Sequence, residues 1–422
     1  MRLLYTILLY LGTPLFLWRL HQKGKRNPDY KLRWSERFGH VPFTLDGCVW
    51  LHSVSLGESI AAAPIIKHLL ATYPEKTLLV TTTTPTGSAH IQKLFGDKVK
   101  HCYFPYDVPH AVARFLRRTQ PTACIIMETE LWPNMLRACQ AHKIPVLLAN
   151  ARLSERSAQG YGRFAGVTKN MLHAMQNVVA QYQDDGDRFV RLGLPKDRLN
   201  ISGNIKFDIT VPDTIEENIQ TLRKQIGNRP VWIAASTHAG EEEAVFAAHH
   251  TIMQSHPEAL CILVPRHPER FDEVATLATQ QGLTIARRSS GEEISETTQL
   301  FLGDTMGEMM RFFALSHVAF IGGSLAPIGG HNLLEPAALS VPSLTGPNMH
   351  NFKEIAKLFT EAGATQYVHD AKELAQAVLG LFADPAQAKV IGQKGLAIIE
   401  ENRGALQTLL QHIAHCVEGA QG

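Results

Sequence analysis

The sequence predicts an α/β protein with two doubly wound, Rossmann-like parallel-sheet domains behind an apolar N-terminal helix. Three observations predict this fold: a length of 422 residues, two successive series of short apolar runs separated by helical stretches, and a basic cluster after the first apolar segment. Domains usually contain about 100–200 residues, so two domains are expected. Apolar residues make up 45% of the chain and charged residues 19%, which is ordinary for a globular protein.

The N-terminal segment 3–18 is almost entirely apolar and is interrupted by Pro14. Positive charge flanking an apolar segment marks the cytoplasmic side of a membrane, and here residues 1–40 carry a net charge of +6 against −4 for the rest. We therefore expect residues 1–22 to form a membrane-anchor helix, either spanning or interfacial, against anionic lipid. A cleaved signal peptide is disfavoured because the basic stretch follows the apolar run, and a buried core helix is the remaining alternative. The basic residues that follow at once are Arg19, His21, Lys23, Lys25 and Arg26.

Continuous apolar strands that alternate with helices are typical of parallel sheets covered on both faces. The strand-like runs are 48–53, 77–82, 123–128, 146–150 and 178–181, then 231–236, 260–265, 284–287, 300–304, 318–323 and 341–346. Helical composition occupies 58–72, 108–118, 240–255 and 270–281. Pro212 and the Gly227–Pro230 stretch lie near the join, so we expect an N-terminal domain at 23–211 and a C-terminal domain at 212–422.

Several classes of protein are disfavoured by what the sequence lacks. The body is mildly acidic, which argues against a nucleic-acid partner, and no G-x-x-x-x-G-K-[ST] phosphate loop occurs, which argues against an ATPase. The six cysteines are far apart, so neither a disulfide framework nor a zinc cluster is expected. The triplet Asp185-Gly186-Asp187 could bind a metal, but its place at a probable helix start favours a capping role.

In the first predicted domain, carboxylates follow two of the strands. Glu58 lies in the first turn of a helix, where backbone N–H groups and the helix dipole would hold it as an anion at neutral pH; a plain first-turn glutamate is the alternative. Glu128 and Glu130 end another strand, and alternation would place both on one side of an extended chain. Two such acids can have separated pKa values and hold substrate hydroxyls; a capping carboxylate for the next helix is the alternative. Lys206, near the join, is either a surface residue or a partner for a phosphate or carboxylate.

In the second predicted domain, polar loops follow four strands, and we expect them to form a nucleotide-sized site. Glycine-rich backbone leading into a helix is a natural phosphate cradle, and Arg266 adds a planar fork for an anion. Helix capping by Thr305 with Glu308, and by Asn332 with Glu335, is the alternative for two of these loops. The loops are 236–238, 265–270, 304–308, and 322–324 with 329–335.

Taken together, these motifs resemble the Kdo (3-deoxy-D-manno-octulosonic acid) transferases of lipopolysaccharide synthesis over nearly the whole chain. The matching stretches, in order, are KRNPDYKLRWSERFG, HSVSLGES, TTTTPTGS, METELWPN, LLANARLSERS, STHAGEE, LVPRHPERF, GDTMGEM and GGHNLLE. The family's last motif often has Pro where this chain has Leu333, and both residues are apolar.

The resemblance implies a GT-B glycosyltransferase fold and an inverting transfer of Kdo from CMP-Kdo to the lipid A precursor, lipid IVA, at the cytoplasmic face of the inner membrane of a Gram-negative cell. It implies no metal ion and no cofactor. Glu58 is similar in position to the family's catalytic base, and Glu128 and Lys206 to its transition-state stabilisers. The implied CMP-binding residues are Arg266, His267, Met306, Gly307, Glu308, Asn332, Leu333, Leu334 and Glu335.

Departure of CMP would give an oxocarbenium-like transition state, a base would activate the acceptor hydroxyl, and domain closure would expel water. Two other functions are compatible with this architecture. A nucleotide-sugar epimerase would act on a soluble substrate and would not need a membrane leader. A non-catalytic membrane adaptor would tolerate loss of Glu58 and of Arg266.

Overall fold

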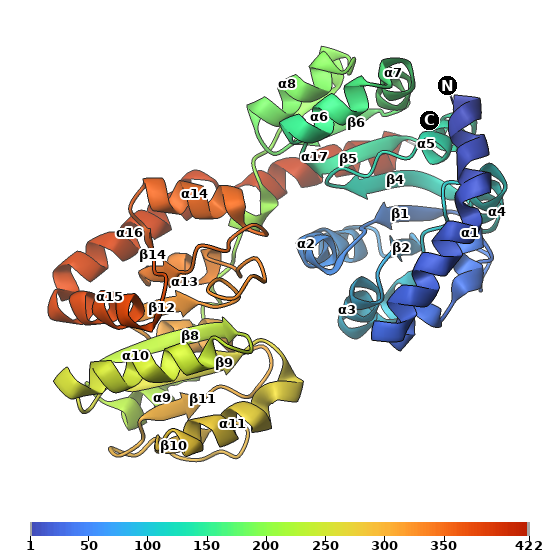
Figure 1. Cartoon of the computed structure of the whole chain (residues 1–422). Helices are drawn as coiled ribbons and strands as arrows, with labels where there is room; N and C mark the ends of the chain where they lie inside the picture. Colours follow the sequence, from blue (N-terminus) through green and yellow to red (C-terminus); the bar gives the residue numbers. More distant parts are fainter. Residues whose placement is uncertain (1, 420–422) are drawn as a thin grey trace. The chain divides into compact units, whose positions relative to one another are not determined.

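The computed structural model describes residues 2–419 and divides the chain into two compact units (Figure 1). Unit 1 comprises residues 1–208 together with 403–422, and unit 2 comprises residues 209–402. Met1 and residues 420–422, which belong to the predicted ranges 1–22 and 212–422, lie outside the described residues. Each unit contains one seven-stranded parallel sheet with helices on both faces, so the two doubly wound domains predicted from the sequence are confirmed.

The sheet of unit 1 has the strand order β3-β2-β1-β4-β5-β6-β7. The order reverses between β1 and β4, which is the place where doubly wound sheets bind ligands. The strands are β1 (Cys48–His52), β2 (Leu78–Thr82), β3 (Lys100–Tyr103), β4 (Pro121–Met127), β5 (Val146–Ala151), β6 (Asn177–Ala180) and β7 (Leu199–Ile201). The helices are α1 (Arg2–Arg26), α2 (Leu56–Thr72), α3 (Pro85–Phe95), α4 (Pro109–Thr119), α5 (Pro133–Ala141), α6 (Glu155–Gly162), α7 (Ala165–His173), α8 (Gln183–Arg191) and α17 (Ala405–Glu418), with short 3-10 turns at Pro28–Lys31, Trp34–Phe38, Gly96–Lys98, Lys196–Arg198 and Ile205–Phe207.

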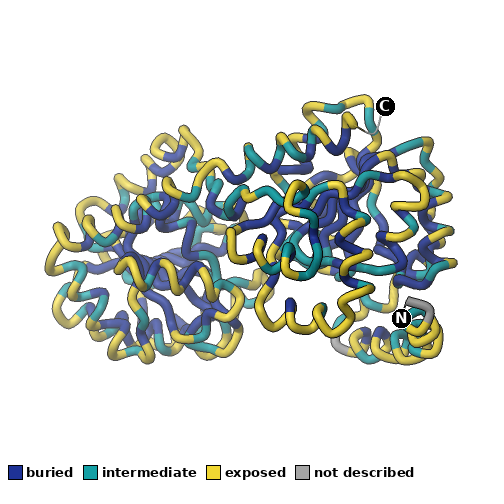
Figure 2. The backbone as a smooth tube through the Cα atoms, turned by 90° about the horizontal axis from the view of Figure 1, so that it is seen from above, coloured by how far each residue is buried: buried dark blue, intermediate teal, exposed yellow. Residues whose placement is uncertain are grey.

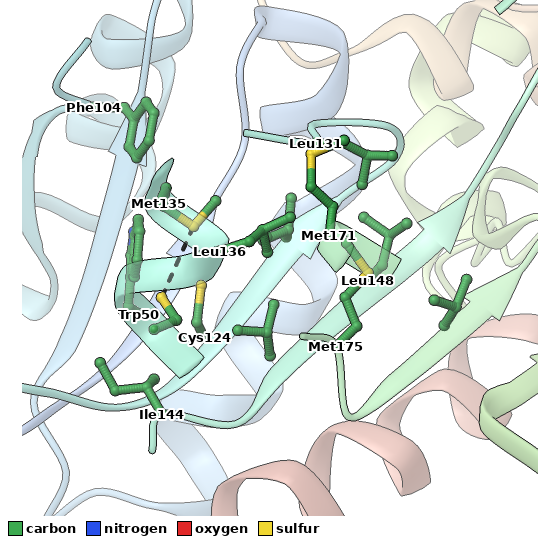
Figure 3. Close-up of a cluster of buried hydrophobic side chains, with 14 of the residues drawn as sticks. Trp50, Phe104, Cys124, Leu131, Met135, Leu136, Ile144, Leu148, Met171 and Met175 are labelled. Carbon is green, nitrogen blue, oxygen red and sulfur yellow. Dashed lines mark hydrogen bonds between the residues drawn. The ribbon is translucent and has the colours of Figure 1, made fainter. Parts of the chain in front are cut away.

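Alternate residues of the strands supply two apolar layers, because successive side chains point to opposite faces of a sheet. Trp50 of β1 packs in the layer that includes Phe104 and Met135 (Figure 3). Its neighbour Leu51 packs in the opposite layer, which includes residues of α2 and α17. Figure 2 shows that the buried residues lie in the interior of each unit and that the exposed ones lie on its outer turns and loops. All six cysteines are free and buried; five lie in these two layers, and Cys261 lies in the core of unit 2.

Unit 2 repeats the plan, with the strand order β10-β11-β9-β8-β12-β13-β14 and a reversal between β8 and β12. Its strands are β8 (Val231–Thr237), β9 (Leu260–Pro265), β10 (Ile285–Arg287), β11 (Leu300–Leu302), β12 (Val318–Ile321), β13 (Ser343–Thr345) and β14 (Thr365–Tyr367). Its helices are α9 (Ile215–Ile226), α10 (Glu242–Ser255), α11 (Phe271–Gln280), α12 (Met309–Ala314), α13 (Leu334–Ala338), α14 (Lys353–Glu361), α15 (Ala371–Ala383) and α16 (Pro385–Glu401), with a 3-10 turn at Pro268–Arg270.

The end of the chain differs from the predicted domain 212–422, because α17 belongs to unit 1. Leu409 and Ile413 of α17 are buried in the layer that Leu51 shares. The carboxylate of Asp208 accepts hydrogen bonds from the backbone N–H groups of Gly404 and Leu406, both at 2.7 Å. An apolar helix face and a capped helix start therefore hold the C-terminal segment on the first sheet.

Helix α1 runs along the outside of unit 1 beside α4, with Pro14 inside it (Figure 1). Tyr5 donates a hydrogen bond to Asp107, Thr6 donates one to Asn134, and Phe16 stacks on a tyrosine of the loop before α4. The opposite side of α1 exposes an apolar stripe, so α1 is not a buried core helix. The stripe consists of Leu4, Ile7, Leu8, Leu11, Leu15 and Trp18, each between 46% and 73% exposed. Among the described helices, none combines the length and the apolar character needed to cross a membrane.

Candidate active site

Three carboxylates of unit 1 gather where the order of its sheet reverses. Glu58 follows β1, and Glu128 and Glu130 follow β4, the strand beside it. The charges of Glu58 and Glu128 each act on the pKa of Glu130. All three side chains are half-buried. The sequence placed these residues after two separate strands, and the parallel pairing of β1 with β4 brings them together.

Glu58 is oriented by the turn that begins α2. Ser55 caps the helix through its hydroxyl oxygen, and Glu58 reaches back toward the same turn. The N–H of Val54 donates to Oε2 of Glu58 at 2.7 Å, and the hydroxyl of Ser55 donates to Oε1 at 3.0 Å. The glutamate therefore takes part in the helix cap, while its half-buried carboxylate is fixed in one orientation.

Burial raises the pKa of Glu58 above its ordinary value. The hydrogen bond from Val54 opposes this rise, and the charge of Glu128 adds to it. The predicted stabilisation by backbone N–H groups is present, but the loss of water outweighs it, so the pKa of Glu58 lies above its ordinary value and not below it. A raised pKa makes the ionised carboxylate a better proton acceptor.

Glu128 pairs with Lys206, whose ammonium nitrogen lies 3.6 Å from Oε1 of the glutamate. Glu128 follows the last residue of β4 in a left-handed conformation, with φ at 57°. Lys206 is in a 3-10 turn after β7, where Asn204 accepts a hydrogen bond from its backbone N–H. Lys206 was predicted to be either a surface residue or a partner for a phosphate or carboxylate. The structure favours a carboxylate partner, Glu128, which lies in the same unit.

Glu130 is a functional candidate that the predicted catalytic set omitted. Burial and then the charge of Glu58 raise its pKa to about 7. The sequence did mark Glu128 and Glu130 as a pair, but the reason given was wrong. Strand β4 ends at Met127, and the left-handed Glu128 breaks the extended alternation at once. The two carboxylates are near each other because of the turn and not because of a shared strand face.

In unit 2, the predicted nucleotide loops follow β11, β9, β8 and β12. These four strands are consecutive neighbours in the sheet. The glycine-rich loop after β12 is not an open phosphate cradle. The buried carboxylate of Glu241 accepts hydrogen bonds from the backbone N–H groups of residues 323 to 326, at 2.6 to 3.3 Å. The expectation of a phosphate site at Gly322–Ser324 is thus corrected: the chain's own carboxylate already fills it.

The carboxylate of Glu308 is also bound by groups of the chain itself. Arg288 binds both carboxylate oxygens, at 2.9 and 3.0 Å, and Arg311 adds a third contact at 2.7 Å. These guanidinium groups lower the pKa of Glu308 to about 2. The Thr305 hydroxyl also donates to the Glu308 carboxylate, but α12 begins at Met309 without a side-chain cap, so the capping interpretation of Thr305 with Glu308 is wrong. Met306 and Gly307 are the exposed residues of this loop.

The loop before α13 is ordered by Asn332, although α13 itself has no side-chain cap hydrogen bond. The amide oxygen of Asn332 accepts from the N–H of Leu334 at 3.1 Å, and its amide nitrogen donates to Glu335 at 3.3 Å. Leu333 and Leu334 are buried, so only their backbone can reach a nucleotide. Burial raises the pKa of Glu335, and the nearby charge of Arg266 opposes that rise.

The Asp185-Gly186-Asp187 triplet is part of α8 and not a separate ligand loop. Oδ1 of Asp185 accepts a hydrogen bond from the N–H of Leu153 at 2.8 Å, and Arg188 lies 3.5 Å from the same oxygen. Asp187 accepts one from Gln183. Within residues 2–419, no three histidine, cysteine, aspartate or glutamate side chains are grouped so that they could hold a metal ion.

Comparison with solved structures first shows the type of fold. The chain is similar to a glycosyltransferase from Rickettsia africae, with a TM-score of 0.53 and 14% identity over 89% of this chain and 99% of that one. At this identity the similarity concerns the fold alone. The two Rossmann-like parallel α/β units, each with polar loops at its switch point, therefore give the chain the GT-B type of fold.

Comparison with curated sequences then identifies the family. The chain is 41% identical to a 3-deoxy-D-manno-octulosonic acid transferase of Haemophilus influenzae over 97% of each protein, and 36% identical to the one from Bordetella pertussis over 96% and 97%. Residues 32–209 match the family described as 3-deoxy-D-manno-octulosonic-acid transferase (kdotransferase). The chain belongs to this family and is a transferase enzyme, which confirms the predicted resemblance and argues against the epimerase and adaptor alternatives.

Proposed function

We propose that this enzyme transfers Kdo from CMP-Kdo to the lipid A precursor, lipid IVA, in lipopolysaccharide biosynthesis, with inversion at the anomeric carbon. The observation that carries this proposal is the carboxylate of Glu58, fixed by two hydrogen bonds and half-buried beside Glu128. Family membership supports the transferred sugar. The names of the relatives do not specify an acceptor, so lipid IVA is the more specific part of the proposal.

In the proposed reaction, Glu58 accepts the proton of the acceptor hydroxyl while that oxygen bonds to the anomeric carbon and the bond from carbon to the CMP oxygen breaks. The raised pKa of Glu58 suits it to this role. The charged pair of Lys206 and Glu128 supports the developing charges without protein rearrangement, because it is already formed. CMP leaves with its phosphate charge, which a nearby cation would stabilise.

We assign donor binding to unit 2. Arg266 and His267 follow β9, and Met306 with Gly307 follows β11. Glu308 acts through the arginines that hold it, and residues 332–335 offer mainly backbone groups together with the side chain of Asn332. The amides of residues 323–326 are not available for the phosphate, because Glu241 binds them.

We propose that α1 anchors the enzyme at the cytoplasmic surface of the inner membrane as an interfacial helix. Its exposed stripe of leucines, Ile7 and Trp18 suits the boundary between lipid head groups and acyl chains. Its opposite side is held on unit 1 through Tyr5 and Thr6. The basic residues after the stripe would contact anionic head groups.

The purified full-length chain, incubated with CMP-Kdo and lipid IVA in mixed micelles, tests the function. Mass spectrometry should show lipid IVA with Kdo added and an equal amount of CMP released. The mass also reports how many Kdo units are added. Release of an altered sugar nucleotide with no lipid product would contradict the proposal and favour an epimerase.

A further inference from the structure

Three histidines and an arginine of unit 2 surround the end of β8. The Nε2 atoms of His238 and His331 are 2.8 Å apart, and their rings are parallel to within 2°. The ring of His267 stands at 80° to that of His238, with 5.1 Å between centroids. Arg266 is close enough to act on the pKa values of both paired histidines. Four groups able to bear positive charge therefore meet where the sheet order reverses, a place suited to an anion.

The backbone holds this pair in place. Oε2 of Glu241 accepts hydrogen bonds from the N–H groups of both His238, at 3.0 Å, and Gly323, at 2.6 Å. A Cβ atom at Gly323, where φ is 66°, would lie 2.8 Å from the ring of His331. The glycine thus allows the close approach of the ring, and Glu241 fixes the two segments that face it. The distance between the imidazoles is set by buried structure and not by surface side chains.

The geometry of the pair limits its protonation. With Nε2 atoms at 2.8 Å, one nitrogen must donate a proton and the other must accept it, because two N–H groups cannot face each other at that distance. The pair can gain one further proton on an outer nitrogen and keep its hydrogen bond, but it cannot gain two. The two histidines therefore titrate as one unit.

Burial and neighbouring positive charges disfavour protonation of the pair when no anion is bound. Burial, and after it the charges of His238, Arg266 and His267, lower the pKa of His331 to about 3. Burial also lowers the pKa of His238, as do the charges of His267, Arg266 and Arg270, whereas Glu241 acts in the opposite direction. An anion bound against the pair would offset both the lost hydration and the neighbouring positive charges.

We propose that His238 and His331 form the subsite for the phosphate of the nucleotide donor, beside Arg266, and that the pair takes up one proton when the phosphate binds. This role rests on the proposed function, in which unit 2 binds CMP-Kdo. It assigns His238 and His331 a place in donor recognition and makes donor affinity depend on pH. Because binding takes up a proton, affinity falls as pH rises, by up to about tenfold per pH unit.

The probe for this subsite is cytidine 5′-(methyl phosphate), a phosphodiester that does not itself titrate near neutral pH. Isothermal titration of the full-length chain at pH 7, in buffers of different ionisation enthalpy, measures the protons exchanged on binding. We expect net proton uptake and a dissociation constant that rises between pH 6 and pH 8. Binding with no uptake and no dependence on pH would overturn this inference and leave the proposed donor site standing.

The variants His238→Gln and His331→Gln locate the proton. Each should bind the probe at least about tenfold more weakly and without proton uptake. The matched control is His369→Gln, which removes an exposed histidine of the same unit and should leave uptake unchanged. Uptake that persists in both pair variants would overturn the assignment. Failure of the wild-type chain to bind the probe would overturn the donor site and this subsite together. If one variant does not fold, the other variant and the wild-type pH dependence still decide.

Discussion

The ammonium of Lys206 lies 3.6 Å from the carboxylate of Glu128, although 78 residues separate them in the chain. Both side chains are partly exposed, at 30% and 22%, so the pair faces solvent and is accessible to a substrate. Such a pair adds little to stability. Its glutamate nevertheless has a left-handed backbone conformation, and its lysine lies in a 3-10 turn that Asn204 caps. Geometry of this kind at a sheet switch point favours a role in the reaction over a role in folding.

Replacing Lys206 tests that role. We expect Lys206→Met to lower kcat about 10- to 100-fold, because a preformed cation is lost, while the free energy of unfolding changes by less than about 1 kcal/mol. Lys206→Arg should restore part of the rate. Steady-state kinetics and urea unfolding measure the two quantities. The exposed Lys196→Met is the matched control in the same unit, and a similar loss of rate in both variants would refute the assignment.

Glu58→Gln removes the proposed base and keeps the shape of the side chain. We expect kcat to fall about 10²- to 10⁴-fold, with no change in the affinity for the cytidine phosphodiester, which unit 2 binds. In the wild-type enzyme, kcat should rise with pH as Glu58 loses its proton. Glu75→Gln, at an exposed site of the same unit, is the control. Undiminished transfer by Glu58→Gln would exclude this residue as the base.

Glu130 should make the stability of unit 1 depend on pH. Its folded-state pKa of about 7 lies above its ordinary value, so between about pH 4.5 and pH 7 the folded chain binds more protons than the unfolded chain. Stability is therefore lost as pH rises through this range. Glu130→Gln should unfold like the wild type at pH 4.5 but be about 2 kcal/mol more stable at pH 8. Urea unfolding at both pH values, with Glu75→Gln as control, checks this; an equal difference at both pH values would contradict it.

Glu308 has the opposite dependence. Its pKa of about 2 lies below its ordinary value, so its contribution to stability is present above about pH 4.5 and is lost as pH falls toward 2. We expect Arg288→Met to destabilise unit 2 by about 1–2 kcal/mol at pH 7, after allowance for solvent screening, and to weaken binding of the cytidine phosphodiester. Arg223→Met, which breaks an exposed ion pair, should have almost no effect. If Arg288→Met binds the cytidine phosphodiester as tightly as the wild type, Glu308 does not position the loop 304–308 for the donor.

The stripe on α1 can be tested with lipid vesicles. We expect Leu8→Glu combined with Leu11→Glu to reduce flotation with vesicles containing anionic phospholipid by at least about tenfold, because two exposed leucines no longer enter the interface. Val390→Glu, at an exposed apolar site of unit 2, is the control and should float like the wild type. Equal flotation of all three proteins would exclude α1 as the anchor.

The sequence by itself determined the two series of strands, their alternation with helices and the placement of polar motifs after strand ends. These features are local, because a continuous apolar run such as 260–265 must be buried whatever surrounds it. Strands β3, β7 and β14 were not predicted. They are short, and their exposed or half-buried residues do not give a continuous apolar run.

Only the tertiary structure decided which groups meet. The return of α17 to the first sheet depends on Asp208, which lies 196 residues before Gly404. The pairing of His238 with His331 spans 93 residues, and the occupation of the glycine-rich amides by Glu241 spans more than 80. Such contacts follow from strand order and from buried hydrogen bonds between distant segments. No local pattern of residues specifies these contacts, because each motif is compatible with its own helix or strand whether or not the distant segment lies beside it.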